Sequence, residues 1–158
     1  PELEANASAD DGTANWNSLI VDLDELMASS GLGNLLTLTV SVDTNAGAEN
    51  IFVVKDNIIQ TPPLSAGGLE GITRDSVIQI IEENGGFVIE RDLERDDLYL
   101  ADEIFMTGTA AEVKSVTQID KVKIGSGKMG KITRSLQKSF SDASLGKDER
   151  FLPWLTFI

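Results

Sequence analysis

The 158-residue chain contains neither cysteine nor histidine. Without cysteine it can form no disulfide and no thiolate metal site, and without histidine it lacks the commonest general base and the commonest metal ligand. Any proton transfer must therefore use lysine, a carboxylate or Tyr99, the single tyrosine. We expect no metal centre.

The sequence also lacks a long hydrophobic segment. No apolar run approaches the roughly 20 residues that a membrane-spanning helix needs. The N-terminus has neither the positive charge nor the apolar stretch of a signal peptide. These absences predict a soluble, cytoplasmic protein with no membrane partner.

Basic residues are missing from the first third of the chain. Residues 1–54 hold nine acidic residues and no basic one, whereas residues 55–158 hold 17 acidic and 13 basic residues, so that −9 and −4 sum to the net charge of −13. A surface this acidic repels phosphate backbones, and nucleic acid is not expected as a partner. Residues 1–12 are small and acidic and are expected to be loose, with residues 13–158 forming one domain.

The first half of the chain shows patterns of one helix and three strands. Apolar residues recur at helical spacing over 14–29, and apolar and polar residues alternate over 36–42 as in a half-buried strand. Residues 50–55 and 58–61 predict a hairpin, because Asp56-Asn57 between them tolerates the positive φ of a tight turn.

The second half mixes helices and strands. Thr73 is expected to be the N-cap of a helix over 74–83, which Asn84-Gly85-Gly86 ends. The later elements are expected, in order, as a strand over 87–91, a helix over 95–100, strands over 103–107, 113–119 and 121–124 with a turn at Asp120, and a helix over 130–144. This irregular order predicts an α+β fold with a mixed sheet or distorted barrel and flanking helices.

Two short segments have the composition of anion sites. Gly71-Ile72-Thr73 stands at a predicted helix N-terminus, where unpaired N–H groups and the helix dipole favour a phosphate. Thr107-Gly108-Thr109-Ala110 follows a predicted strand, where small residues let backbone amides face a ligand. Taken singly, an ordinary capped helix start and an ordinary tight turn remain alternatives.

Taken together, these two segments resemble the class IV pyridoxal phosphate aminotransferases, and the branched-chain amino acid aminotransferases in particular. Five further segments carry the resemblance, which spans about two thirds of the chain: Glu49–Asp56, Thr61-Pro62-Pro63, Ala101–Phe105, Ile124–Lys128 and Trp154–Ile158. The D-amino-acid aminotransferases and aminodeoxychorismate lyases match these segments less well. The implied fold is the large domain of the family, without its small N-terminal domain.

The resemblance also implies roles for individual residues. Gly71, Ile72, Thr73 and Thr109 would bind the cofactor, with Ile72, Thr73 and Thr109 in contact with its phosphate. Leu69 would pack against the pyridine ring. Thr109 and Ala110 would face the substrate carboxylate. The implied partners are pyridoxal phosphate, an amino acid with its 2-oxo acid, and further copies of the chain in a homo-oligomer; the implied reaction is amino transfer between Leu, Ile or Val and 2-oxoglutarate.

Departures from the family pattern fall in the first 50 residues. The Schiff-base lysine position falls at Asp11, or Asp10 with a one-residue slip, and the tyrosine that tunes the ring falls at Trp16. Asn45 stands where the family has the glutamate that protonates the pyridine nitrogen. An aspartate cannot form an imine, so the chain is expected to have impaired or no activity and to bind cofactor weakly or not at all.

Three interpretations follow from these departures. A start at Pro1 without methionine favours a fragment of a longer aminotransferase. Alternatively, the chain is a non-catalytic protein that binds a phosphorylated ligand, or it is a structural or dimerisation module derived from the same fold.

Overall fold

The computed structural model describes residues 18–21, 50–66 and 68–156. The predicted loose segment 1–12, the predicted strand 36–42, and Asp10, Asp11, Trp16 and Asn45 lie outside the described residues.

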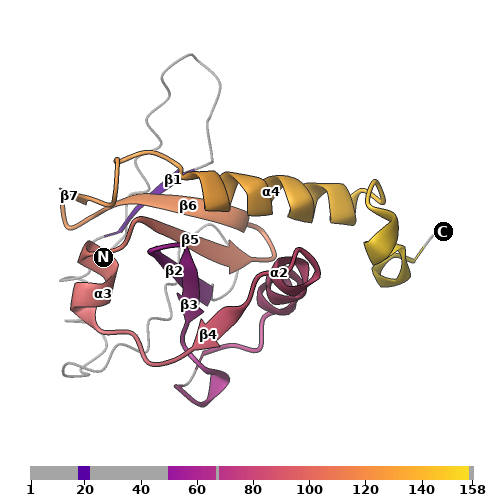
Figure 1. The fold of residues 1–158 in the computed structure, drawn as a ribbon, viewed down its shortest axis with the longest axis horizontal. Helices are drawn as coiled ribbons and strands as arrows, with labels where there is room; N and C mark the ends of the chain where they lie inside the picture. Colours follow the sequence, from indigo (N-terminus) through magenta and orange to yellow (C-terminus); the bar gives the residue numbers. More distant parts are fainter. Residues whose placement is uncertain (1–17, 22–49, 67, 157–158) are drawn as a thin grey trace.

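A mixed β-sheet forms the centre of the molecule (Figure 1). Its strands are β1 (Ser18–Val21), β2 (Asn50–Lys55), β3 (Ile58–Thr61), β4 (Val88–Glu90), β5 (Glu103–Gly108), β6 (Glu112–Ile119) and β7 (Val122–Lys123). Their order is β1-β6-β5-β2-β3-β4, with β7 paired to β6. The β1–β6 and β3–β4 pairs are parallel and the others antiparallel. The predicted α+β fold and mixed sheet are confirmed, and the described strands form an open path rather than a closed barrel.

Helices pack around this sheet. The described helices are α2 (Ile72–Glu83), α3 (Arg95–Tyr99), α4 (Lys131–Ser144), and the 3₁₀ helices η1 (Leu64–Ala66) and η2 (Glu149–Trp154). In Figure 1, α4 runs along β6, and α2 lies beside α4. Helix α3 lies at the end of the sheet opposite to α2. No helix in the described part of the chain is long and apolar enough to cross a membrane.

Both predicted hairpins are confirmed. Asp56 and Asn57 have φ of 49° and 63° and connect β2 to β3. Asp120 and Lys121, with φ of 49° and 66°, connect β6 to β7. Two consecutive residues of positive φ give the turn a twist that matches that of the strands, which is why Asp and Asn suit it.

Helix α2 begins two residues earlier than predicted. Its N-cap is Gly71, which supplies no side-chain hydrogen bond, and the predicted N-cap Thr73 lies buried within the first turn. The prediction of a Thr73 cap is therefore wrong. The predicted stop is confirmed: Gly85 adopts φ +80°, and the amide of Gly86 donates to the carbonyl of Ile81 at 2.9 Å.

The predicted helix over 14–29 is wrong at residues 18–21. These residues form β1, which pairs in parallel with β6 from Ser18 opposite Ser115 to Val21 opposite Ile119. The local sequence Leu19-Ile20-Val21 is continuous, apolar and partly β-branched, which also suits a strand. Pairing with β6, which is far along the chain, favours the strand over the helix at these residues. A local sequence pattern gives no information about such a distant partner.

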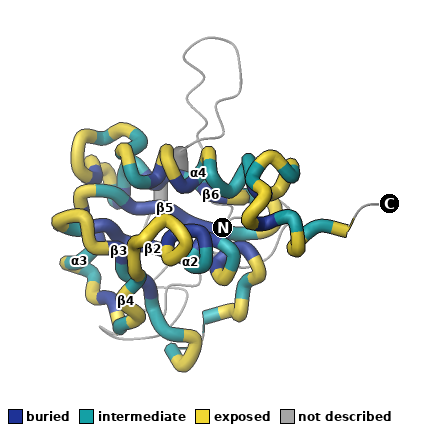
Figure 2. The backbone as a smooth tube through the Cα atoms, turned by 45° about the vertical axis from the view of Figure 1, so that its right-hand side comes forward, coloured by how far each residue is buried: buried dark blue, intermediate teal, exposed yellow. Residues whose placement is uncertain are grey.

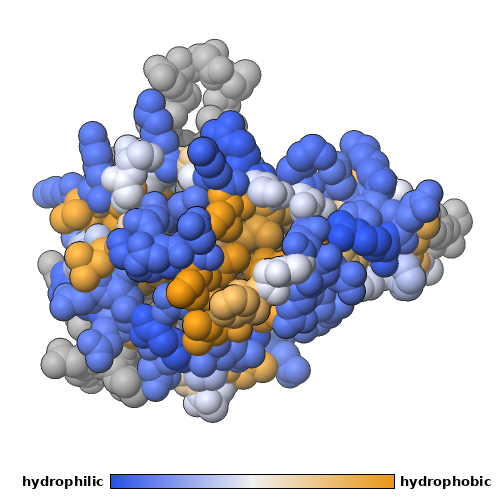
Figure 3. All heavy atoms as spheres, in the orientation of Figure 1, coloured by the Kyte–Doolittle hydropathy of each residue, from blue (hydrophilic) through white to orange (hydrophobic). Residues whose placement is uncertain are grey.

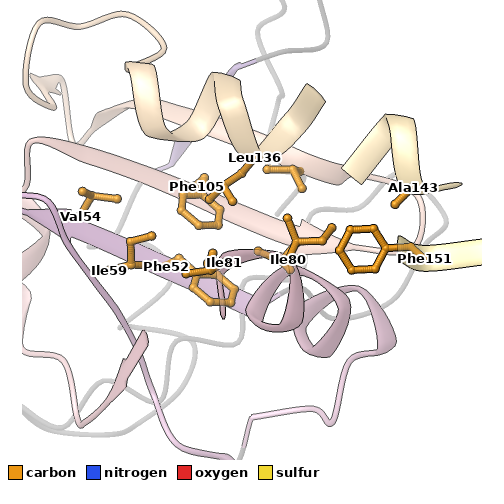
Figure 4. Packing of buried hydrophobic residues seen from close by; sticks show 11 residues of the cluster. Phe52, Val54, Ile59, Ile80, Ile81, Phe105, Leu136, Ala143 and Phe151 are labelled. Atoms are coloured by element: carbon orange, nitrogen blue, oxygen red, sulfur yellow. The ribbon is translucent and has the colours of Figure 1, made fainter. Parts of the chain in front are cut away.

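Hydrophobic residues are buried in two clusters, one on each face of the sheet. Figure 2 shows that buried residues follow the central strands. Alternating residues of β2 and β5 point to opposite faces, which follows from the two-residue period of a strand. Ile51, Val53, Ile104 and Met106 pack with Leu98 on the α3 side. Phe52, Val54 and Phe105 pack under α2 and α4 with the residues labelled in Figure 4. The Phe52 and Phe105 rings stack with centroids 4.8 Å apart.

Candidate functional site

The site predicted at the start of α2 lies where β2 begins and β5 ends. Asn50, the first residue of β2, is opposite Thr107 near the end of β5. The side-chain amide of Asn50 donates a hydrogen bond to the carbonyl of Leu69 at 2.8 Å, just before α2. One side chain therefore connects the sheet to the segment that leads into the helix.

The first turn of α2 presents backbone amides without a side-chain cap. Gly71 has extended dihedral angles and its carbonyl accepts from the amide of Asp75 at 3.0 Å. Amides in the first turn of a helix have no intrahelical acceptor, and the positive end of the helix dipole adds to their attraction for an anion. Ile72, the first residue of this turn, is 84% exposed.

The second predicted segment follows β5 and turns into β6. Gly108 pairs with Glu112, and Thr109 and Ala110 between them are exposed. Thr107, one residue before this turn, is fully buried, and its hydroxyl has no hydrogen-bond partner within the described part of the chain. An unpaired buried hydroxyl is uncommon and costs free energy, so this one stands out at the edge of the site.

Arg74 connects the first turn of α2 to two strands. Its buried guanidinium donates to the carbonyl of Pro62 at 3.1 Å and pairs with Glu90 on β4 at 3.0 Å. Its Nε atom has no partner among the described residues. Because a carboxylate already pairs with the guanidinium, its positive charge is partly neutralised.

The structure thus shows where the predicted cofactor- and substrate-binding residues lie. Leu69, Gly71, Ile72 and Thr73 lie together at the start of α2, and Thr109 and Ala110 lie in the turn after β5, the strand whose Thr107 is opposite Asn50. Sequence reasoning missed Asn50 and Arg74 as site residues, and it included Thr107 only as part of the small-residue segment after β5. Asn50 and Arg74 lie in or next to the segments that carried the family resemblance, but nothing in their residue type indicated a role.

Other ionisable clusters lie outside the site, around α3. Asp97 accepts two hydrogen bonds from Arg91, at 3.0 and 2.6 Å, and this bidentate pair lowers the pKa of Asp97. Burial and a hydrogen bond to Asp120 raise the pKa of Tyr99. Within the described residues, no three acidic side chains come together as a metal site would require.

The family model for class IV amino-transferases matches residues 35–119, just over half of the chain. The chain therefore belongs to the class IV aminotransferase family, as the resemblance implied.

Among its relatives, branched-chain amino acid aminotransferases match over most of the chain. The Escherichia coli K12 enzyme is 39% identical over 139 residues, which are 88% of this chain and 45% of that enzyme. The Pseudomonas aeruginosa enzyme is 44% identical over 110 residues, 70% of this chain and 36% of that enzyme. The chain thus spans less than half the length of these relatives.

Solved structures show the same likeness in three dimensions. The branched-chain aminotransferase from Thermoproteus uzoniensis, solved with norvaline, superposes with a TM-score of 0.65 at 44% identity, over 68% of this chain and 35% of that one. The branched-chain amino acid aminotransferase from Thermobaculum terrenum, solved in its PLP-form, superposes with a TM-score of 0.67 at 33% identity, over 84% of this chain and 44% of that one.

Proposed function

We propose that residues 13–158 form the cofactor-binding large domain of a class IV aminotransferase and bind the phosphate of pyridoxal phosphate at the start of α2. The observation that carries the proposal is the first turn of α2, whose N-cap Gly71 supplies no side-chain cap and follows Leu69, the residue whose carbonyl accepts a hydrogen bond from Asn50 on the sheet. The relatives solved in the PLP-form or with pyridoxamine 5'-phosphate support this choice of anion.

The described residues fit the phosphate end of this cofactor. The amides of Ile72 and Thr73 and the exposed hydroxyl of Thr109 would hold the phosphate, and the amides of the Thr109–Ala110 turn would face a substrate carboxylate. The Leu69 side chain is 52% exposed, which leaves an apolar surface for the pyridine ring. Backbone amides at a helix start and threonine hydroxyls are donors that suit a phosphate.

The catalytic end of the site is the weaker half. When bound, the cofactor supplies an electron sink for the amino acid. The chain has no lysine before Lys55, and Asp11 and Asn45 stand at the positions of the lysine and the acid. We therefore propose that the chain binds the cofactor weakly and reversibly and has little or no activity in amino transfer between branched-chain amino acids and 2-oxoglutarate.

The first turn of α2, without a side-chain cap, also favours a second candidate function. In this case the chain is a non-catalytic protein that binds a phosphorylated small molecule. The two functions differ in what the phosphate is attached to. A site built for the cofactor binds pyridoxal phosphate more tightly than inorganic phosphate, because Leu69 adds a contact to the ring, whereas a general phosphate site binds both alike.

The proposal is tested by titrating the chain with pyridoxal phosphate and following its absorbance. We expect saturable binding that inorganic phosphate reverses. Thr109→Val should weaken this binding by about tenfold, because it removes one hydrogen bond to a charged group. Thr117→Val on β6, away from the site, is the matched control and should bind as the unaltered chain does.

Activity is measured in the same preparations with leucine and 2-oxoglutarate. We expect no turnover above that of free cofactor. Turnover at an enzymatic rate would contradict the proposed loss of the catalytic end. Absence of any saturable binding would contradict the phosphate site itself.

A homo-oligomer is proposed as the assembled form. Figure 3 shows hydrophobic side chains gathered between α4 and the lower strands of the sheet and surrounded by hydrophilic ones. Leu69 and Ile72 are exposed apolar residues at the site itself. Contiguous apolar surface with a polar rim is typical of protein contacts.

A further inference from the structure

Asn50 is a nearly buried polar residue with two contacts at the start of α2. Its side chain is 9% exposed, and its amide nitrogen bonds the carbonyl of Leu69, 19 residues further along the chain. A buried amide group that bonds a distant backbone carbonyl costs free energy if either partner is removed. The contact therefore fixes where Leu69 lies relative to β2.

The carbonyl of Leu69 accepts a second hydrogen bond, from the amide of Gly71 at 2.8 Å. Two donors, one from the sheet and one from the helix N-cap, thus converge on the same oxygen. These two hydrogen bonds direct the Leu69 carbonyl toward β2 and Gly71.

Gly71 lies so close to Asn50 that no side chain fits between them. A Cβ atom at residue 71 would overlap the side-chain oxygen of Asn50, and it would also lie 3.6 Å from the Cβ of Arg74. The close approach explains why a glycine is the N-cap here although it offers no side-chain hydrogen bond. Asn50 and Gly71 together define the position of the first helical turn.

We infer that Asn50 is a positioning residue for the anion site: it holds the first turn of α2 so that the amides of Ile72 and Thr73 can bind a phosphate. This inference rests on the proposed function, because it requires that the start of α2 binds a phosphate. Asn50 acts through Leu69 and Gly71 and does not itself contact the anion.

The test measures the affinity for inorganic phosphate from the chemical shifts of the Ile72 and Thr73 amides in ¹⁵N-labelled chain. Asn50→Leu removes the hydrogen-bond donor, stays neutral and keeps the number and branching of the side-chain heavy atoms. We expect it to weaken phosphate binding by about tenfold. Asn84→Leu, at the other end of α2, is the matched control and should leave the affinity within twofold of the unaltered chain. Asn50→Ser, also neutral but too short to reach Leu69, replaces Asn50→Leu if that variant does not fold.

A double-mutant cycle tests the contact with Gly71. Gly71→Ala should weaken phosphate binding strongly in the unaltered chain, because the new methyl group displaces Asn50 or the helix. In an Asn50→Ala background the methyl group has room, and the further loss should be several times smaller. Additive losses, or phosphate affinity within twofold of normal in Asn50→Leu, would overturn the inference.

The same cycle is repeated without ligand by urea denaturation, so that the two proposals can fail separately. If the unaltered chain shows no shift with phosphate, the proposed function fails, and coupling in the urea cycle still establishes that Asn50 positions the helix start. If phosphate binds but the substitutions at residues 50 and 71 have additive effects in both cycles, the positioning role fails and the proposed function stands.

Discussion

At the scale of single residues, Ile80 and Ile72 in α2 differ most in how far they are exposed to solvent. Ile80 is fully buried under α4 and the sheet, whereas Ile72 is almost fully exposed. Ile80→Ala should lower the free energy of unfolding by about 2–5 kcal/mol, since it removes buried methyl and methylene groups and leaves a cavity. Ile72→Ala should change it by less than about 0.5 kcal/mol. Urea denaturation measures both, and similar values for the two variants would contradict the assigned orientation of the helix.

The Arg91–Asp97 pair makes stability depend on pH. Hydrogen bonds from Arg91 lower the pKa of Asp97 below its usual 3.8, so the unfolded chain takes up the proton first as pH falls. The contribution of the pair to stability is thus complete above about pH 4 and is lost as pH falls through the lower, folded pKa.

Asp97→Asn should therefore reduce the steepness with which stability falls below about pH 4, as followed by urea denaturation between about pH 2 and 6. Asp96→Asn removes a neighbouring carboxylate that does not pair with Arg91, and it serves as the control. An Asp97→Asn chain that loses stability as steeply as the control would show that the ion pair does not contribute.

Among the secondary-structure elements, α4 has an N-terminus capped from the sheet. The carboxylate of Glu103 on β5 accepts from the amides of Ile132 at 3.1 Å and Thr133 at 2.8 Å and from the Thr133 hydroxyl at 2.7 Å. A carboxylate here satisfies amides that the helix cannot, and it also complements the helix dipole.

Glu103→Ala should lower the free energy of unfolding by about 0.5–2 kcal/mol, the usual cost of losing a helix cap. Glu103→Gln keeps one carbonyl oxygen and should lose less. Amide hydrogen exchange at Ile132 and Thr133 should quicken in the same order. Equal exchange in all three proteins would contradict the capping role.

Elements whose signals are local could be predicted from the sequence, and those that depend on distant partners could not. The two hairpins were predicted because Asp56-Asn57 and Asp120 lie in the turns themselves. The start of α2 was misplaced because its glycine N-cap reflects the nearby Asn50 side chain rather than a local capping preference. β1 was mistaken for a helix because its partner strand begins only at Glu112.

The site residues, too, could be predicted where their signals are local and not where they depend on distant contacts. The Gly71–Thr73 and Thr107–Ala110 segments could be found because their residue types suit an anion. Asn50 and Arg74 could not be assigned, since their roles come from contacts with Leu69, Pro62 and Glu90 that only the folded chain brings together.

For the molecule as a whole, charge is expected to oppose association while apolar surface favours it. The first 54 residues carry a net charge of −9 and are repelled by those of a second copy. Added salt screens this repulsion, so the proposed homo-oligomer should become more stable between about 0.05 and 0.5 M NaCl.

Sedimentation equilibrium measures this association directly. Leu69→Asp should weaken it, whereas Leu100→Asp, an exposed leucine after α3, is the matched control. A monomer at every salt concentration would contradict the oligomer and leave a self-sufficient single domain.

The cap on α4 also has a consequence for how this sequence can change over time. Gly130, the N-cap of α4, is so close to Glu103 that a Cβ there would overlap the glutamate side chain. A lineage that shortened residue 103 would leave the helix start uncapped and, by the same step, open room for serine or aspartate at residue 130 to cap it locally. Either change alone destabilises the start of α4, and the two together restore its cap. Residues 103 and 130 are therefore expected to covary among related sequences.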